Sequence, residues 1–70
     1  MKTRYFIDKD SKQLRGKFYK DGDTYIVDFS GNIWFGGYFN MFLFVRKEHA
    51  EAKLQELLTT HPNFMEIEND

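Results

Sequence analysis

The sequence predicts an α+β fold: a small antiparallel β-meander of four to five strands, one C-terminal helix packed on one face, and room for a short last strand. Three observations lead to this prediction. The pair Asp21-Gly22 stands between two runs of alternating apolar and polar residues, which is a strong short-range signal for a β-hairpin. Aromatic residues, which favour strands, make up 19% of the chain. A stripe of apolar residues with helical spacing follows late in the sequence.

The length and composition fit one domain spanning residues 1–70. A chain of 70 residues has room for one small core, because a domain of this size buries only about 60% of the surface of its unfolded chain. It contains no cysteine, and no apolar run approaches the roughly 20 residues that span a bilayer. Charged residues stand near its start, where a signal peptide needs an apolar stretch. We therefore expect a soluble, cytoplasmic protein.

Three strands are expected in the first half of the chain. The first, at about residues 3–8, is joined by a polar turn to a hairpin with strands at about 13–20 and 23–29. With Asp21-Gly22 as a two-residue type I′ loop, Phe18 pairs with Tyr25.

This register divides the hairpin into two faces and sets Arg15 opposite Asp28. The side chains expected in the core are Leu14, Phe18, Tyr25, Val27 and Phe29. The opposite face carries Arg15, Lys17, Tyr19, Thr24, Ile26 and Asp28.

Two further strands are expected at about residues 32–36 and 38–45. Gly36-Gly37 separates them, as glycines do at a bulge or a sharp bend. The second of these strands is apolar on both faces. In an alternative interpretation Asn40 caps a helix that begins at Met41, so residues 41–45 are either a strand, which we prefer, or the start of the helix.

The helix itself is expected at about residues 46–60. Its apolar stripe consists of Ala50, Leu54, Leu57 and Leu58. Pro62 cannot continue a helix and biases His61 away from helical geometry. The residues after it allow a short strand at about 64–67.

No pattern in the sequence is typical of an active site. His49 and His61 are too far apart for the spacing that places two imidazoles on one helical face for zinc, and His61 is expected to interact with the last carbonyls of the helix. The aspartates do not form a calcium-binding loop, and the glycines lack the lysine of a phosphate-binding loop. We expect no catalytic residue, no metal and no cofactor, and hence no enzyme.

A single helix can shield only one face of such a sheet. The second face is not cleanly polar, because Tyr19 and Ile26 lie on it, so curling of the sheet, a second copy of the chain or a partner must cover it. The position of Trp34 depends on the turn before it. A two-residue turn places Trp34 in the core, whereas a three-residue turn places it on the second face.

These features favour a small, aromatic-rich, non-catalytic protein-interaction module. It would act as a regulator or inhibitor by docking an exposed aromatic sheet surface onto a protein partner. By analogy, it could be a phage-encoded protein that antagonises a factor of the host cell. The expected partner-binding residues are Trp34, Phe35, Tyr38, Tyr19 and Ile26.

Two alternatives remain open at this point. The first is a single-stranded nucleic-acid-binding protein with a basic and aromatic sheet face, whose binding residues would be Arg4, Arg15, Lys17 and Lys20. The first 20 residues carry seven Lys or Arg against two Asp, whereas residues 48–70 carry six carboxylates against one Lys. This asymmetry also fits a simple attraction between the two ends. The second alternative is a structural homodimer. No membrane association is expected.

Overall fold

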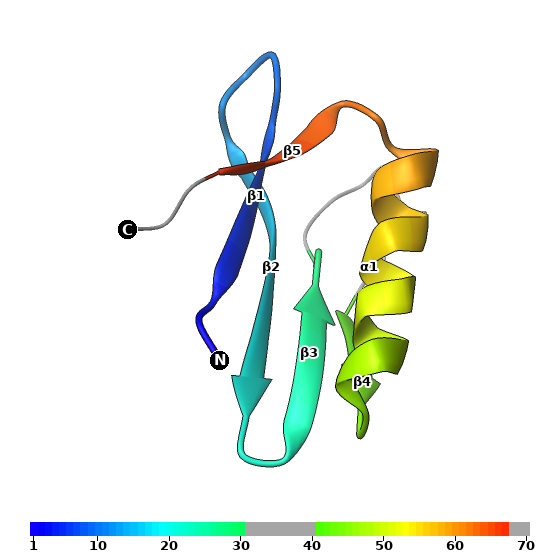
Figure 1. Ribbon diagram of the computed structural model, residues 1–70. Helices are drawn as coiled ribbons and strands as arrows, with labels where there is room; N and C mark the ends of the chain where they lie inside the picture. Colours follow the sequence, from blue (N-terminus) through cyan, green and yellow to red (C-terminus); the bar gives the residue numbers. More distant parts are fainter. Residues whose placement is uncertain (31–40, 68–70) are drawn as a thin grey trace.

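The computed structural model describes residues 1–30 and 41–67. In this part of the chain a five-stranded antiparallel sheet of order β4-β3-β2-β1-β5 packs against one helix (Figure 1). The elements are β1 Arg4–Asp8, β2 Leu14–Asp21, β3 Thr24–Asp28, β4 Met41–Phe44, α1 Lys47–Thr60 and β5 Phe64–Ile67. The predicted α+β class, with a C-terminal helix and a short last strand, is confirmed.

The segment before the helix is a strand. Met41–Phe44 forms β4, which pairs with β3, and the helix begins only at Lys47 after Arg46 in extended geometry. The alternative of a helix starting at Met41 is therefore wrong. The predicted strand 32–36, the Gly36-Gly37 interruption and the turn that decides the side of Trp34 lie outside the described residues.

The β2–β3 hairpin turns one residue later than the sequence predicts. Asp21 pairs with Thr24, so the two loop residues are Gly22 and Asp23. Gly22 has a φ of 61°, and Asp23 is not among the residues with positive φ. Positive φ at the first loop residue alone is the pattern of a type II′ turn. The predicted type I′ turn on Asp21-Gly22 is wrong.

This turn moves each pairing of the hairpin by two residues but keeps its faces. Phe18 pairs with Val27 and Lys17 with Asp28, so the predicted pairing of Arg15 with Asp28 is wrong. A shift of two residues leaves every side chain on its original side of the sheet, whereas a shift of one would reverse all of them. The predicted core positions Phe18 and Val27 are accordingly fully buried.

A β-bulge interrupts the pairing of β1 with β2. Phe6 pairs with Gly16, but the next residue, Ile7, pairs with Leu14, so Arg15 is the extra residue. A bulge moves the residues beyond it to the other face. Leu14 therefore lies on the side of Ile7 and is 58% exposed, and its predicted place in the core is wrong.

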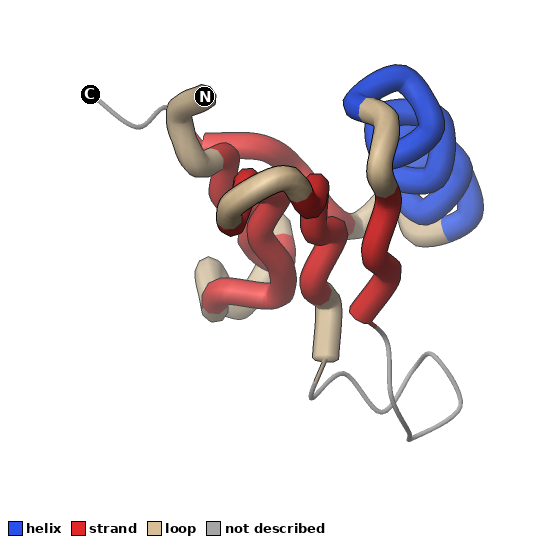
Figure 2. Tube along the Cα trace, turned by 90° about the horizontal axis from the view of Figure 1, so that it is seen from below, coloured by secondary structure: helices blue, strands red, loops and turns tan. Residues whose placement is uncertain are grey.

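The helix buries its predicted stripe against one end of the sheet. Ala50, Leu54 and Leu57 are buried, and Leu58 packs against them. The helix packs on β3 and β4, and Figure 2 shows it on one side of the sheet, over the β4 end. Among the described residues no helix is long and apolar enough to cross a membrane.

The core is built around the ring of Phe29, just after β3. This ring lies 5.7 Å from that of Phe64 and 5.8 Å from that of Phe6, measured between centroids. It rests directly on the backbone of Gly16, where a Cβ atom would overlap its carbons. The buried cluster consists of Phe6, Phe18, Val27, Phe29, Ala50, Leu54, Leu57 and Phe64.

An ion pair covers part of the same face beside β1 and β5. Arg4 donates two hydrogen bonds to Glu66, from Nε to Oε2 and from Nη2 to Oε1, each 2.8 Å long. The guanidinium carbon of Arg4 lies 5.8 Å from the ring centroid of Phe6 and 5.7 Å from that of Phe18. A planar guanidinium in this position shields aromatic rings and still keeps its charge paired.

The close approach of Phe29 to Gly16 makes Gly16→Ala destabilising. The new methyl group must displace the ring, and such overpacking costs about 1–3 kcal/mol. In a Phe29→Leu background the smaller side chain leaves space, so the cost of Gly16→Ala should be clearly lower. Urea unfolding of the four proteins of this double-mutant cycle measures the difference.

Gly22→Ala is the matched control for this cycle. Gly22 has a positive φ and open space around its Cα atom, so its substitution strains the backbone without touching the core. Its cost should be equal in both backgrounds. Equal costs of Gly16→Ala in both backgrounds would contradict the packing described here.

Candidate functional site

The side of the sheet away from α1 is the first candidate site, and we call it the open face. No described helix or strand packs on it. Because side chains alternate along a strand, its members are those opposite to the buried cluster. They are Tyr5, Ile7, Leu14, Lys17, Tyr19, Asp21, Thr24, Ile26, Asp28, Met41, Leu43, Met65 and Ile67.

The open face is apolar and partly exposed. Leu14 and Leu43 are each 58% exposed and Met65 is 38% exposed. Ile26, on the interior strand β3, is only 7% exposed and pairs with Tyr19 on one side and Leu43 on the other. The exposed apolar surface therefore lies toward the margins of this face, around a centre that is already packed.

The structure brings together two of the predicted partner-binding residues. Tyr19 and Ile26 are direct cross-strand neighbours on the open face. Trp34, Phe35 and Tyr38 lie outside the described residues.

Several members of the open face were not predicted from the sequence, for two different reasons. The alternation of side chains along residues 41–45 places Met41 and Leu43 on one face of the strand, so this pattern could have identified them. Leu14 reaches this face only through the bulge at Arg15, which the alternating pattern of β2 does not reveal.

The four cations predicted to bind nucleic acid do not share one face. Arg4 and Lys20 lie on the side of α1, where Arg4 pairs with Glu66 and the Lys20 Nζ atom lies 5.3 Å from the ring centroid of Tyr25. Lys17 is on the open face. Arg15 is the bulge residue, and its charge acts on the carboxylate of Asp8.

A second candidate is a cavity of about 440 Å³ at the end of the helix. Its lining residues are Asp8, Thr60, His61, Pro62, Asn63 and Phe64. The imidazole of His61 stacks on the ring of Phe64, with an interplanar angle of 11°. The cavity thus combines a carboxylate, a hydroxyl group and an imidazole, which are the groups found in many hydrolytic sites. Their hydrogen bonds determine whether any of them is placed to act as a base or a nucleophile.

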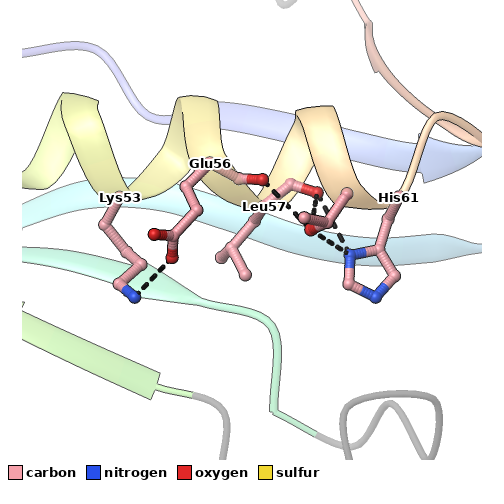
Figure 3. A network of polar contacts seen from close by, with 5 residues as sticks. Lys53, Glu56, Leu57 and His61 are labelled. Atoms are coloured by element: carbon pink, nitrogen blue, oxygen red, sulfur yellow. Dashed lines mark hydrogen bonds and ion pairs between the residues drawn. The ribbon is translucent and has the colours of Figure 1, made fainter.

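Those hydrogen bonds are the ones that end a helix. His61 donates its backbone N–H to the carbonyl oxygen of Leu57 at 2.9 Å, and its Nδ1 atom lies 3.1 Å from the same oxygen (Figure 3). A carbonyl oxygen only accepts, so Nδ1 donates in this contact when it carries the proton. In that tautomer it does not accept a proton from the Thr60 hydroxyl, 2.9 Å away. The predicted interaction of His61 with the last helical carbonyls is confirmed.

Asp8 organises the polar side of this cavity. Its Oδ1 atom accepts hydrogen bonds from the backbone N–H groups of Asp10 at 2.8 Å and Ser11 at 3.0 Å, and its Oδ2 accepts one from Asn63 Nδ2 at 2.9 Å. These bonds, the one from Ser11 foremost, lower the pKa of the Asp8 carboxyl despite its burial, with the nearby charge of Arg15 adding to the effect. The carboxylate therefore holds two turns together.

Neither candidate offers a metal site. Within the described ranges, 1–30 and 41–67, no group of three or more His, Cys, Asp or Glu side chains is placed to hold an ion. The open face offers contact area, and the cavity offers a hydrogen-bonded helix end.

Comparisons with known proteins add no further assignment. No protein-family model, no curated protein and no solved structure matches this chain. Its function must therefore be inferred from the geometry of the open face and of the cavity.

The depressed pKa of Asp8 predicts loss of stability in acid. As the pH falls below the ordinary carboxyl value of 3.8, the unfolded chain binds a proton before the folded chain does, so the free energy of unfolding decreases. Glu66 contributes in the same direction, because its hydrogen bonds with Arg4 lower its pKa. Asp8→Asn should be less stable than the wild type at neutral pH and should show a flatter decline in acid.

Urea unfolding between about pH 7 and pH 2 tests this prediction. Asp10→Asn is the matched control, because the side chain of Asp10 is exposed, and it should retain the steep decline. A decline in Asp8→Asn as steep as in the wild type would show that Asp8 does not contribute.

Proposed function

We propose that this protein is a small, non-catalytic protein-interaction module that docks a protein partner through its open face. The observation that carries the proposal is the concentration of exposed apolar side chains there, with Leu14, Leu43 and Met65 all on the side opposite α1. Exposed apolar patches on small domains commonly mark interaction surfaces.

The composition of the open face suits a protein partner. Two tyrosines, Tyr5 and Tyr19, supply large and rigid contact area at low cost in conformational entropy. Charge on this face is limited to the neighbouring Lys17 and Asp28, which carry opposite signs, and to Asp21 beside the hairpin turn. Aromatic side chains with few charged residues among them are typical of protein interfaces.

A nucleic-acid partner is less well supported. Binding to phosphates needs several cations on one surface, but Arg4 and Lys20 lie on the opposite side of the sheet from Lys17, and Arg4 is already paired with Glu66. The surface that would stack bases therefore has too few cations beside it.

In this proposal the module acts by occupying a surface of its partner. A domain that binds through one flat face regulates or inhibits by covering a surface of its partner, and it needs no chemistry of its own. Because the chain lacks cysteine, we place this interaction in the reducing environment of the cytoplasm.

Leu43→Asp tests the proposal, because it puts a charge on the open face at a side chain that is already 58% exposed. The fold should survive, while affinity for the partner should fall about 10-fold or more, which corresponds to about 1.4 kcal/mol. The partner is identified by capture with the tagged wild-type chain from cells of its source. Its affinity for each variant is then measured by calorimetry with purified proteins.

Gln55→Asp, on the exposed side of α1, is the matched control and should bind as the wild type does. Equal affinity of Leu43→Asp and Gln55→Asp would overturn the assignment of the open face. Salt-sensitive binding to single-stranded DNA or RNA that Lys17→Ala abolishes would favour the nucleic-acid alternative instead.

A further inference from the structure

The open face carries one pair of opposite charges near its middle. Lys17 on β2 and Asp28 on β3 are direct cross-strand partners, so they lie at the same height on two adjacent strands. The same row continues with Tyr5 on β1 and Met41 on β4. A positive and a negative charge thus sit side by side within an otherwise apolar row.

This arrangement is complementary to its own copy. A two-fold axis parallel to the strands, running between β2 and β3, turns the second sheet so that its β3 covers β2 of the first. Lys17 then faces Asp28 of the partner subunit, and the partner's Lys17 faces Asp28. Symmetry makes both contacts with one surface, as in every isologous dimer.

We propose that the protein bound by the open face is a second copy of this chain, in a face-to-face dimer with this axis. The inference rests on the proposed function, since it names the partner of the same surface. The dimer has four layers, with the two sheets in contact and a helix outside each of them. Its sheets pack about 10 Å apart with their strands nearly aligned.

The apolar residues beside the charges fit the same symmetry. The axis places Tyr19 over Ile26 of the partner subunit, since these two residues also share a height on β2 and β3. One strand further out, it places Tyr5 over Met41 of the partner subunit, an aromatic ring against a thioether. Sheet twist disturbs such pairs least next to the axis, so the charge pair and Tyr19 should define the contact.

The area of the open face limits the affinity. With the axis between β2 and β3, four strands of each copy overlap and β5 lies outside the contact; at about 4.8 Å spacing and about 17 Å length these four cover roughly 330 Å² on each copy. The two copies together bury about 650 Å², which is below the 1,200–2,000 Å² of stable interfaces. The net charge of −1 per chain adds little repulsion. We therefore expect a reversible dimer that forms with increasing concentration.

Charge exchange provides the decisive experiment. Lys17→Glu makes both members of the central pair negative, and Asp28→Lys makes both positive, so each variant should be monomeric because like charges then face one another across the axis. An equimolar mixture of the two variants should form a heterodimer, in which the two carboxylates at positions 17 and 28 of one chain face the two lysines at positions 28 and 17 of the other. Sedimentation equilibrium from about 10 µM to 1 mM measures the masses, a range that covers affinities expected for a weak interface.

Two more variants keep the test independent of local folding effects. Asp28 also accepts hydrogen bonds from the backbone N–H and the hydroxyl group of Ser30, so Asp28→Lys requires a check of its fold by circular dichroism. Leu43→Asp leaves this turn intact and should also give a monomer. Lys20→Glu makes the same charge change on the other face of β2 and should leave the dimer unchanged.

The results separate this inference from the proposed function. A wild-type chain that stays monomeric up to about 1 mM, or a dimer that Lys17→Glu and Leu43→Asp leave intact, overturns the dimer described here. If the monomeric chain still binds a different protein in a manner sensitive to Leu43→Asp, the proposed function stands without a second copy as its partner. Concentration-dependent dimers and a restored mixture support the inference.

Discussion

The contact between the ring of Phe29 and the backbone of Gly16 holds the fold together. Only glycine leaves room for the ring at that point, and the ring in turn contacts Phe6 on β1 and Phe64 on β5. The register of the β2–β3 hairpin follows from it, since a type II′ turn at Gly22 brings β3 into the position that places Phe29 over Gly16. One aromatic residue thereby joins the central strands to one edge of the sheet.

Several features of this fold were predictable because they depend on side-chain alternation or helical spacing. The two faces of the hairpin and the apolar stripe of α1 follow directly from the order of residues. The exact strand pairing cannot be predicted in this way. A turn on Asp21-Gly22 and a turn on Gly22-Asp23 place the same side chains on each face and differ only in register. The bulge at Arg15 is likewise silent in the sequence, and it alone moves Leu14 from the core to the open face.

The uneven charge of the chain has a structural use. The attraction between a basic N-terminal part and an acidic C-terminal part takes the form of the Arg4–Glu66 pair, which lies across β1 and β5. Glu51 of α1 adds to the field that raises the pKa of Arg4. Both side chains of the pair are more than a third exposed, so the pair itself adds little stability. Its main effect is to shield Phe6 and Phe18 beside the helix.

The open face is the consequence of how this core is closed. A helix of 14 residues is about 21 Å long and shields β3 and β4 from one side only, while Arg4 and Glu66 complete that same side. The helical side of the sheet is thus closed by the described residues themselves, whereas the apolar side chains at the margins of the other side are exposed. Because Ile26 on β3 is already buried, contact with another surface along the exposed margins suits this face better than insertion of a side chain into it.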